Sequence, residues 1–361
     1  MVRPGEFWAG RRVFLTGHTG FKGSWLTLWL RSLGANIAGY ARTPQTEPSL
    51  FAAARVGDGV MSHIGDIDER ANLTETIAAH QPEIIFHLAA QALVRESYRD
   101  PVGTFATNIM GTIHLLESAR AVSSVRAVVI ATSDKCYENR GLARGYREDD
   151  AMGGHDPYSA SKGAAELTVS AYRNSFFGAP GAARVATVRA GNVIGGGDWA
   201  ADRLVPDVVR AAKQGRPVHL RYPSAVRPWQ HVLDALNGFL MLAERLWQPD
   251  GADYARGWNF GPAAEDAISV DTVVARLCQQ LGVEPRWTVV EGPQAHEARA
   301  LTLDSGLARS RLGWRPVLSL DESLHLTGAW YRAFDAGQDM GGFTAGQIDR
   351  FVALRESHAH A

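Results

Sequence analysis

The 361-residue chain is poor in cysteine and has almost no net charge. Its two cysteines, Cys136 and Cys278, are too few for a disulfide framework or a cysteine metal cage. A formal net charge of -1 gives no general attraction to nucleic acid, so any anion-binding charge must be local. We therefore expect no bound metal and no nucleic-acid partner.

The sequence also lacks long apolar stretches. No run approaches the roughly 18 residues of a membrane-spanning helix, and residues 1–6 lack the apolar region of a signal peptide. Hydrophobic residues still make up 45% of the chain, enough for the core of one large domain or two smaller ones. These features predict a cytoplasmic enzyme without a membrane partner.

A glycine-rich turn follows the first strand-like segment. The apolar run 12–16 leads directly into GHTGFKG (17–23), and a helical pattern continues over 24–33. The spacing G-x-x-G-x-x-G differs from the commoner G-x-G-x-x-G, but the physical need is similar. The backbone must approach a pyrophosphate closely, and the helix N-terminus then faces the anion. The segment therefore predicts a dinucleotide site.

A tyrosine and a lysine stand four residues apart on a later predicted helix. Asp156 caps this helix, Pro157 is its first residue, and Tyr158 and Lys162 share one face. A tyrosine is a poor base at neutral pH unless a nearby cation stabilises its phenolate, and Lys162 is suited to be that cation. Such pairs are also common on helix surfaces. Together with the glycine-rich turn, this one predicts proton removal from an alcohol.

Strand and helix signals alternate through the first half of the chain, as a doubly wound parallel sheet requires. Glycine, tryptophan, proline and arginine then cluster over 191–229, which is typical of loops that carry a substrate site. We expect an α/β, Rossmann-like sheet with a smaller, interleaved substrate domain. The dinucleotide-binding domain is expected at residues 1–190 with 231–262, the substrate domain at 191–230 and 263–345, and a C-terminal tail at 346–361, frayed over 356–361.

The expected elements follow from the same patterns. The strands are 12–16, 36–40, 84–88, 127–132, 183–189 and 257–260, and the helices are 24–33, 73–80, 101–121, 157–176, 231–247, 270–281 and 320–334.

Together these motifs resemble the extended short-chain dehydrogenase/reductase family, and longer blocks are similar to its CDP-glucose 4,6-dehydratase branch. The blocks are TGHTGFKGSW (16–25), HLAAQALVRESY (87–98), TSDKCYEN (132–139), RAGNVIGGGDW (189–199), RPWQHV (227–232) and WNFGP (258–262). The resemblance implies a tightly bound NAD and dehydration of CDP-D-glucose to CDP-4-dehydro-6-deoxy-D-glucose. It also implies a homodimer or a dimer of dimers, and a place in making deoxysugars for cell-surface polysaccharides.

The resemblance assigns cofactor contacts to several separate segments. They are Gly17, Thr19, Gly20, Phe21, Lys22, Gly23, Arg42, Asp66, Ile67, Leu88, Ala89, Ala90, Tyr158 and Lys162. Asp66 could equally be a plain turn or cap residue. A NAD-selective sheet usually carries an acidic residue after its second strand, but here that strand runs into Arg42. Arg42 could meet a 2'-phosphate or be a solvated surface arginine, so NAD is favoured over NADP only by the resemblance.

The resemblance further implies a three-stage reaction in which C4 is oxidised, water leaves across C5 and C6, and the hydride returns to C6. Tyr158 would take the proton of the 4-hydroxyl, Ser133 would hydrogen-bond the 4-oxygen, and Asp134 would protonate the departing 6-hydroxyl. Lys135 stands where relatives acting on dTDP-glucose carry a glutamate base, and a buried lysine can be neutral enough for that role. The alternative for Asp134 and Lys135 is a surface ion pair.

Substrate recognition is expected mainly from arginines in the second half, because a diphosphate suits bidentate guanidinium contacts. The candidates are Arg95, Arg203, Arg221, Arg227, His231 and Arg299, of which Arg95, His231 and Arg299 could equally be structural. The resemblance adds Asn192 as a pyrophosphate contact. Trp199 and Trp229 could stack on the base or sugar, or only pack.

Two other functions stay open at this point. One is a sugar-nucleotide 4-epimerase or reductase of the same fold, and the other is a non-catalytic dinucleotide-binding module. The combination of Tyr158, Lys162 and Asp134 argues against the module, because such a module has no physical need for an acid/base set.

Overall fold

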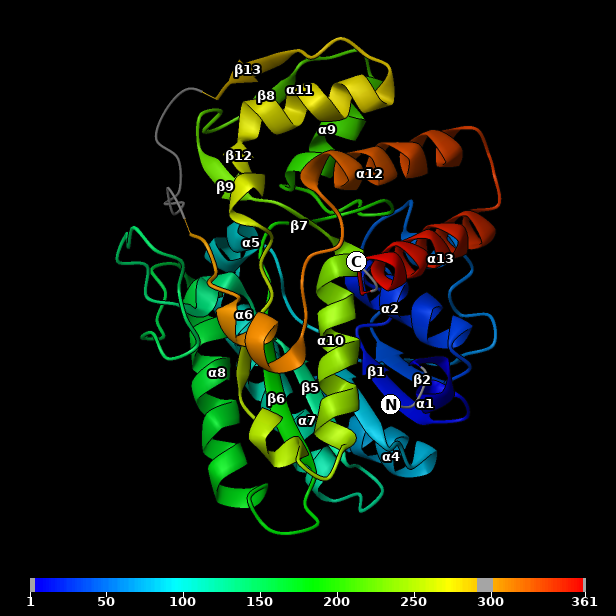
Figure 1. Cartoon of the computed structure of the whole chain (residues 1–361), viewed down its shortest axis with the longest axis vertical. Coiled ribbons are helices and arrows are strands. Elements are labelled where there is room, and N and C mark those ends of the chain that lie inside the picture. The colour runs from blue at the N-terminus through cyan, green and yellow to red at the C-terminus, as the bar shows by residue number, and fades with distance from the viewer. Residues whose placement is uncertain (1–3, 291–300, 360–361) are drawn as a thin grey trace.

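The computed structural model describes residues 4–290 and 301–359 of the chain. A seven-stranded sheet organises its larger part (Figure 1). The strand order is β11-β6-β5-β4-β1-β2-β3, and every neighbouring pair is parallel. The bounds are β1 Arg12–Thr16, β2 Asn36–Ala41, β3 Met61–Ile64, β4 Ile84–His87, β5 Ala127–Ala131, β6 Arg184–Arg189 and β11 Gly257–Asn259. The predicted Rossmann-like fold class is confirmed.

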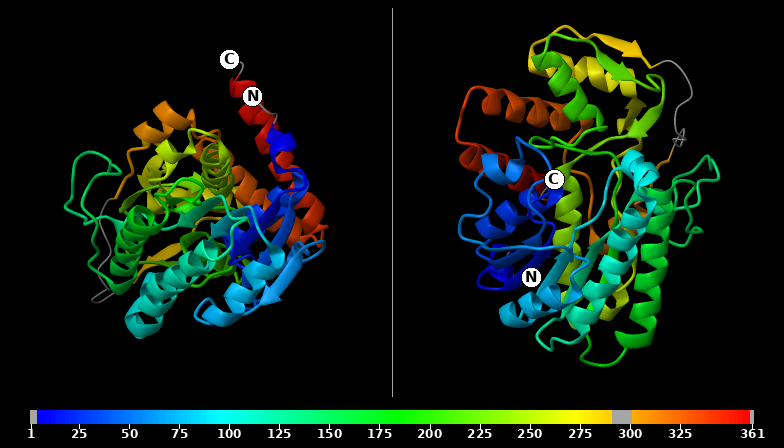
Figure 2. Two further views of the ribbon diagram at one scale, coloured as in Figure 1. Left: turned by 90° about the horizontal axis from the view of Figure 1, so that it is seen from below. Right: turned by 180° about the vertical axis from the view of Figure 1, so that it is seen from behind.

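Helices cover both faces of this sheet, as the views from below and behind also show (Figure 2). Alternate strand residues point to opposite faces: Leu15 and Phe86 pack on one side, and Phe14 and Ile85 on the other. The first side packs against α2 (Phe21–Ser32) and α10 (Val232–Trp247), and the second against α4 (Arg70–His80), α7 (Gly111–Arg120) and α8 (Pro157–Phe176). Strands buried on both faces explain the continuous apolar runs in the sequence.

The helix expected over 101–121 contains a change of pitch. It consists of α6 (Pro101–Phe105), a π-helical turn η1 (Ala106–Met110) and α7. Shorter elements around the sheet are α1 Pro4–Trp8, α3 Leu50–Ala53, α5 Val94–Arg99, the 3-10 turns η2 Asp134–Cys136, η3 Gly251–Tyr254 and η4 Ala264–Asp266, and the π turn η5 Ala308–Leu312.

A smaller lobe lies beyond the C-terminal ends of the strands (Figure 1). It contains α9 (Leu204–Lys213), α11 (Val270–Leu281) and α12 (Leu320–Asp335). Short strands pair within or beside it: β7 Val193–Ile194 with β10 Gln230–His231, β8 Val218–Leu220 with β13 Trp287–Val289, and β9 Val226–Pro228 with β12 Ala267–Ser269. Between its parts the chain returns to the sheet through α10 and β11, and β11 pairs with β6.

The expected C-terminal tail is wrong for the described residues, because α13 (Met340–Ala359) is a helix. Ile348 and Phe351 are buried on it, and the Phe351 ring lies edge-on to Trp29 of α2 with centroids 5.5 Å apart. This apolar contact explains why the segment is ordered. None of the helices in the described ranges is long and apolar enough to cross a membrane.

Candidate active site

A large cavity of about 2530 Å³ separates the strand ends from the smaller lobe. All the predicted cofactor and catalytic residues line it, together with Trp199, Trp229 and most of the predicted substrate residues. Those substrate residues are Arg95, Asn192, Arg203, Arg221 and Arg227. Arg299 lies outside the described residues. Residues that lie as far apart in the sequence as Gly17 and Trp229 therefore meet in one site.

The glycine-rich turn brings backbone closer than any side chain would allow. Gly17 has φ +78°, and a Cβ there would stand 2.7 Å from the backbone nitrogen of Ala89. A Cβ on Gly23 would lie 2.0 Å from the Gly17 carbonyl oxygen. Helix α2 begins directly after Gly20, so its N-terminal N–H groups border the cavity. This bare backbone at a helix N-terminus fits a pyrophosphate.

Buried hydrogen bonds fix the cavity wall next to this turn. The Thr16 hydroxyl bonds to His87 Nδ1 over 2.7 Å and accepts from the backbone N–H groups of Leu88 and Ala89 at 3.2 Å each. Burial lowers the pKa of His87 to about 3, so this imidazole is neutral. His87 therefore supports the wall rather than taking part in proton transfer.

Arg42 follows β2 and Asp66 lies shortly after β3. The two side chains form an exposed ion pair, with 3.8 Å between Arg42 Nε and Asp66 Oδ2. Asp66 Oδ1 also accepts from the backbone N–H of Asp68 at 3.1 Å, so it does form a turn. Both residues line the cavity as well. Asp66 is therefore a turn residue that also lines the cavity, where its contact with the cofactor stays a prediction.

Three consecutive side chains converge where β5 ends. Ser133 caps the turn η2, accepting from the Lys135 N–H at 3.2 Å and donating to Asp134 Oδ1 at 2.9 Å. Lys135 Nζ lies 3.4 Å from the same oxygen. The Asp134 side chain is only 3% exposed, so this is not a surface ion pair. The Asp134 charge raises the pKa of Lys135 against the effect of burial, and Lys135 is therefore protonated at rest.

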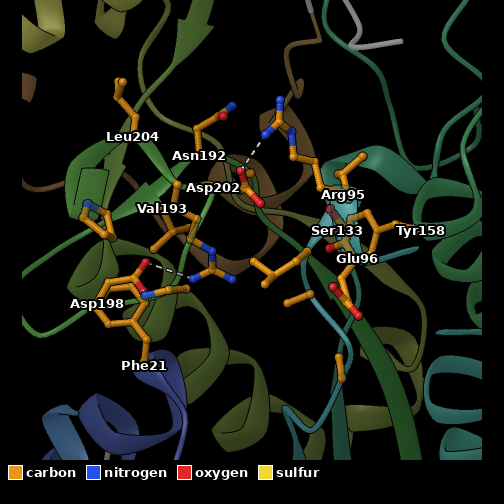
Figure 3. A pocket seen from close by; sticks show the side chains of 18 of the residues that line it. Phe21, Arg95, Glu96, Ser133, Tyr158, Asn192, Val193, Asp198, Asp202 and Leu204 are labelled. Carbon is orange, nitrogen blue, oxygen red and sulfur yellow. Dashed lines mark hydrogen bonds and ion pairs between the residues drawn. The ribbon is translucent and has the colours of Figure 1, made fainter. Parts of the chain in front are cut away.

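Tyr158 and Lys162 lie at the start of α8 on the same side of the cavity. As predicted, Asp156 caps this helix, accepting from the Ser159 N–H at 2.9 Å. Burial raises the pKa of Tyr158, whereas a hydrogen bond with Ser133 and the charge of Lys135 lower it. Figure 3 shows Tyr158 and Ser133 side by side. The sequence predicts that Lys162 supplies the activating charge, whereas in the structure the charges that lower the pKa of Tyr158 belong to Lys135 and Arg203.

Lys162 itself is buried, and burial lowers its pKa to about 8. Its Nζ donates to the carbonyl oxygen of Ala131 at 3.4 Å. At neutral pH Lys162 is therefore still a cation, but one that loses its proton far more easily than an exposed lysine.

Two substrate candidates are already ion-paired with aspartates that sequence analysis did not identify. Arg95 Nη1 lies 2.9 Å from Asp202 Oδ1, and Arg203 Nη1 lies 2.9 Å from Asp198 Oδ2 (Figure 3). Aspartates in glycine-rich loops are commonly turn residues, so the sequence gave no signal for these pairings. The aspartates hold the guanidinium groups at the cavity wall before any anion binds.

The prediction that His231 contacts the substrate is wrong. The residue is fully buried, does not line the cavity, and has its ring edge-on to Trp25. Its Nδ1 accepts from the Leu233 N–H at 3.3 Å, so it caps α10. Burial lowers its pKa to about 3. A short polar sequence pattern could not separate this capping role from a binding role.

A dinucleotide cradle and a Tyr/Lys pair on a doubly wound sheet define a nicotinamide-dependent oxidoreductase-like enzyme. The chain belongs to the NAD dependent epimerase/dehydratase family, whose model matches residues 13–255. The predicted family and the predicted cofactor, NAD, are thereby confirmed.

Individual relatives show which members of this family the chain is most informative to compare with. The chain is 50% identical over 339 residues to the CDP-glucose 4,6-dehydratase of Salmonella typhimurium, covering 93% of this chain and 94% of that protein. It is 27% identical to the solved structure of MoeE5 in complex with UDP-glucose and NAD, with TM-score 0.75 over 90% of this chain and 99% of that one. DesIV, a dTDP-glucose 4,6-dehydratase from Streptomyces venezuelae, is 22% identical with TM-score 0.76 over 91% and 99%, which shows a shared fold.

Proposed function

We propose that the protein dehydrates CDP-D-glucose to CDP-4-dehydro-6-deoxy-D-glucose. The observation that carries the proposal is the Ser133-Asp134-Lys135 turn, which faces the same cavity as Tyr158. A 4-epimerase needs proton transfer only at the 4-hydroxyl, whereas elimination also needs an acid and a base for C6 and C5. The similarity to the Salmonella typhimurium enzyme supports CDP as the nucleotide.

The residues of the cavity fit NAD. The backbone at Gly17 and Gly23 leaves room for a pyrophosphate, and Tyr158 and Lys162 line the same cavity. NAD, when bound, supplies the acceptor and later the donor of the hydride. We assign residues 1–190 and 231–262 mainly to the cofactor, and residues 191–230 and 263–345 mainly to the sugar nucleotide.

In the first stage Tyr158 takes the proton of the sugar 4-hydroxyl. Burial raises the pKa of Tyr158, and the hydrogen bond with Ser133 and the charge of Lys135 offset part of this effect by stabilising the phenolate. Ser133 also has the position to hydrogen-bond the 4-oxygen, because it adjoins Tyr158 at the cavity wall. Deprotonation at this point prepares C4 for oxidation.

The elimination stage uses Asp134 and Lys135 together. At rest they form an ion pair, with Nζ and Oδ1 3.4 Å apart. Transfer of one proton from Lys135 to Asp134 turns this pair into a neutral acid and a neutral base. Asp134 then protonates the departing 6-hydroxyl while Lys135 takes the C5 proton. Water leaves and the ion pair is restored, so the two residues end the cycle as they began it.

The arginines on the lobe side supply the charge for the diphosphate. Arg203 is held by Asp198, and Arg221 and Arg227 line the same cavity. A planar guanidinium suits two phosphate oxygens at once, and none of these arginines lies within a helix: Arg203 precedes α9, Arg221 follows β8 and Arg227 lies on β9. We assign the diphosphate to them and the nucleobase to the neighbouring lobe residues.

We further infer that two copies of the chain associate through α6, α7 and α8. Large apolar side chains are exposed there, including Val102 (78% exposed), Leu167 (62%) and Phe176 (47%), and Met110 (45%) is exposed on η1 between α6 and α7. The helices pack side by side, and exposed apolar groups on adjacent helices mark an interaction surface. A second copy covers the same residues by two-fold symmetry. The product, a 4-keto-6-deoxysugar nucleotide, is suited to supply deoxysugars for surface polysaccharides.

The test is incubation of the purified enzyme and NAD with CDP-glucose, dTDP-glucose, UDP-glucose and GDP-mannose. We expect CDP-glucose to be converted far faster than the others, to a product lighter by one water. A product of unchanged mass would identify a 4-epimerase instead. Equal turnover of all four substrates would contradict the assignment of the nucleobase, and no conversion at all would contradict the function.

A further inference from the structure

A buried glutamate lies one helical turn beyond Lys162 and uses both of its oxygens fully. Glu166 Oε1 accepts from the Thr132 hydroxyl at 2.5 Å and from Arg189 Nε at 2.8 Å. Its Oε2 accepts from the Thr187 hydroxyl at 2.7 Å and from Arg189 Nη2 at 2.8 Å. The side chains of Glu166 and Arg189 are 5% and 4% exposed. Four hydrogen bonds thus join α8 to β6 and to Thr132, the residue that follows β5.

We propose that Glu166 is a positioning residue for the reaction: it fixes the turn that carries Ser133 and Asp134, and it keeps Lys162 cationic. The inference rests on the proposed function, because it concerns the groups assigned to that chemistry. A buried ion pair is in general a weak source of stability and can often be replaced by apolar residues. The Glu166–Arg189 pair lies between the turn that carries Ser133 and Asp134 and the helix that carries Lys162. We therefore expect its role to be the positioning of these groups rather than stability.

The ion pair holds the Ser133-Asp134 turn from both of its ends. Thr132 directly precedes Ser133, and besides its bond to Glu166 its backbone N–H donates to the Val188 carbonyl oxygen at 2.9 Å. On the other side of the turn, the hydroxyl of Tyr137 accepts from Arg189 Nη1 at 2.5 Å. The residues immediately before and after the turn are therefore both tied to the same ion pair. The ion pair therefore fixes the position of the side chains between Thr132 and Tyr137.

The Tyr137 hydroxyl also passes the network on. It donates to Asn259 Oδ1 at 2.7 Å, and Asn259 lies at the end of β11. The network therefore spans α8 and three adjacent strands of the sheet, β5, β6 and β11. A rigid support of this kind limits the drift of Asp134 relative to Tyr158, and small displacements of catalytic groups reduce rates strongly.

Glu166 also affects the charge of Lys162. Burial lowers the pKa of Lys162, and the carboxylate of Glu166 is the strongest influence in the opposite direction. The other titratable groups near Lys162 do not supply a comparable negative charge. Cys136 of η2 is held as a thiol because burial raises its pKa, His87 of β4 is neutral, and Lys22 of α2 is positive. Against the effect of burial, Arg189 lowers the pKa of Glu166 and so keeps this carboxylate ionised. The positive charge of Arg173 partly balances the negative charge of Glu166.

Four variants separate this role from plain stability. Glu166→Gln removes the charge, Glu166→Asp keeps it, and Glu166→Met with Arg189→Met removes both charges without leaving one unpaired. Thr132→Val removes the positional bond while leaving the ion pair intact. Glu244→Gln is the matched control, because Glu244 accepts a 2.7 Å bond from Trp8 away from the cavity.

The readouts are thermal unfolding, kcat and KM for CDP-glucose between pH 6 and 10, and the titration of Lys162. The chain contains only four lysines, Lys22, Lys135, Lys162 and Lys213, so 13C NMR of lysine-labelled protein can follow each one. We expect Glu166→Gln and the double variant to lower the Lys162 midpoint by about one pH unit and kcat by about tenfold, with KM little changed. Glu166→Asp should restore the midpoint, and the control should match wild type in both.

Thr132→Val should lower kcat by about tenfold without moving the Lys162 midpoint. A folded double variant with wild-type kcat and an unchanged midpoint would reduce Glu166 to a structural ion pair. If the Glu166 variants do not unfold cooperatively, Thr132→Val decides alone, and wild-type kcat in that variant overturns the proposal. The NMR titration needs no turnover, so a wild-type enzyme without dehydratase activity would contradict the proposed function while leaving the Lys162 result to be read separately.

Discussion

The carboxylate of Asp134 lies directly against the backbone of Gly191. A Cβ on residue 191 would stand 2.0 Å from Asp134 Oδ2 and 2.2 Å from its Cγ. Gly191 follows β6, whereas Asp134 follows the neighbouring strand β5. The space for the proposed acid is therefore provided by the absence of a side chain on the adjacent strand end.

Replacing Gly191 with alanine tests this relationship. The added methyl meets the end of a short side chain rather than backbone, so we expect Asp134 to move while the fold persists. The kcat should fall at least tenfold with a small change in Tm. Gly178→Ala is the control, because a Cβ there meets nothing closer than 3.8 Å. A Gly191→Ala enzyme with unchanged kcat would show that Asp134 can move without consequence.

Tyr158→Phe removes the proposed base and little else. The ring stays buried, so cofactor and substrate binding should remain within a few fold of wild type while kcat falls by two to four orders of magnitude, roughly. Tyr172→Phe, on the same helix but away from the cavity, is the matched control. Steady-state kinetics and equilibrium binding measure both effects. Near-normal turnover would leave Tyr158 with a structural role only.

Asp134→Asn should separate oxidation from elimination. The amide cannot donate a proton as an acid does, so loss of the 6-hydroxyl should slow while the first oxidation proceeds. Mixing the variant with saturating CDP-glucose should then show build-up of reduced nicotinamide absorbance in a single turnover. Asp321→Asn, at an exposed ion pair, is the control. If neither reduced nicotinamide nor product forms although substrate binds, Asp134 is needed for oxidation.

Stability should depend on pH through Asp234, a fully buried residue near the start of α10. Its oxygens accept from the N–H groups of Val317 at 2.6 Å and Leu318 at 3.3 Å, and burial raises its pKa to about 7. Because the folded state holds this proton more tightly, Asp234 makes the free energy of unfolding fall as the pH rises from about 4 to about 7.

Asp234→Asn cannot titrate, so it should lack this part of the slope. We expect the variant to be less stable than wild type by roughly 1–3 kcal/mol at pH 5 and by a smaller amount at pH 8. Urea unfolding at both pH values measures the difference, with Asp321→Asn again as the control. A deficit that is the same at both pH values would mean that Asp234 is already ionised at pH 5.

The proposed dimer predicts that a charge on its face will separate the subunits. Leu167→Glu introduces a carboxylate at the exposed centre of α8, and we expect a monomer in analytical ultracentrifugation. Val283→Glu, on the lobe at a side chain 37% exposed, should leave the mass unchanged. A wild-type monomer, or a dimer that survives Leu167→Glu, would contradict this interface.

Much of the fold follows from short-range patterns in the sequence. Helix α8 has the predicted bounds because Asp156 and Pro157 are chemically suited to start a helix. In contrast, α9 was not predicted, since the surrounding glycine, proline and arginine residues are typical of loops. Helix α13 was mistaken for a tail because its stability depends on packing against α2 rather than on its own sequence.

The candidate site was predictable where function needs a local motif, and not where it needs distant partners. The glycine turn and the Tyr158/Lys162 pair are each contained within a few residues. The partner of Arg95 lies 107 residues away, and Glu166 meets Thr132 across 34. His231 has the right chemistry for binding but the wrong location. These outcomes depend on tertiary contacts that no local pattern encodes.

The repeated passage of the chain between sheet and lobe limits how the cavity can move. After β6 the chain enters the lobe, returns through α10 and β11, and later forms α12 of the lobe before α13 packs on α2. Asp234 also ties α10 to the segment that leads into α12. A lobe that is connected to the sheet at several points cannot open by the hinge rotation that a single linker would allow. We therefore expect sugar nucleotides to enter through the mouth of a nearly fixed cavity. Only small shear movements of the lobe against the sheet should accompany their entry.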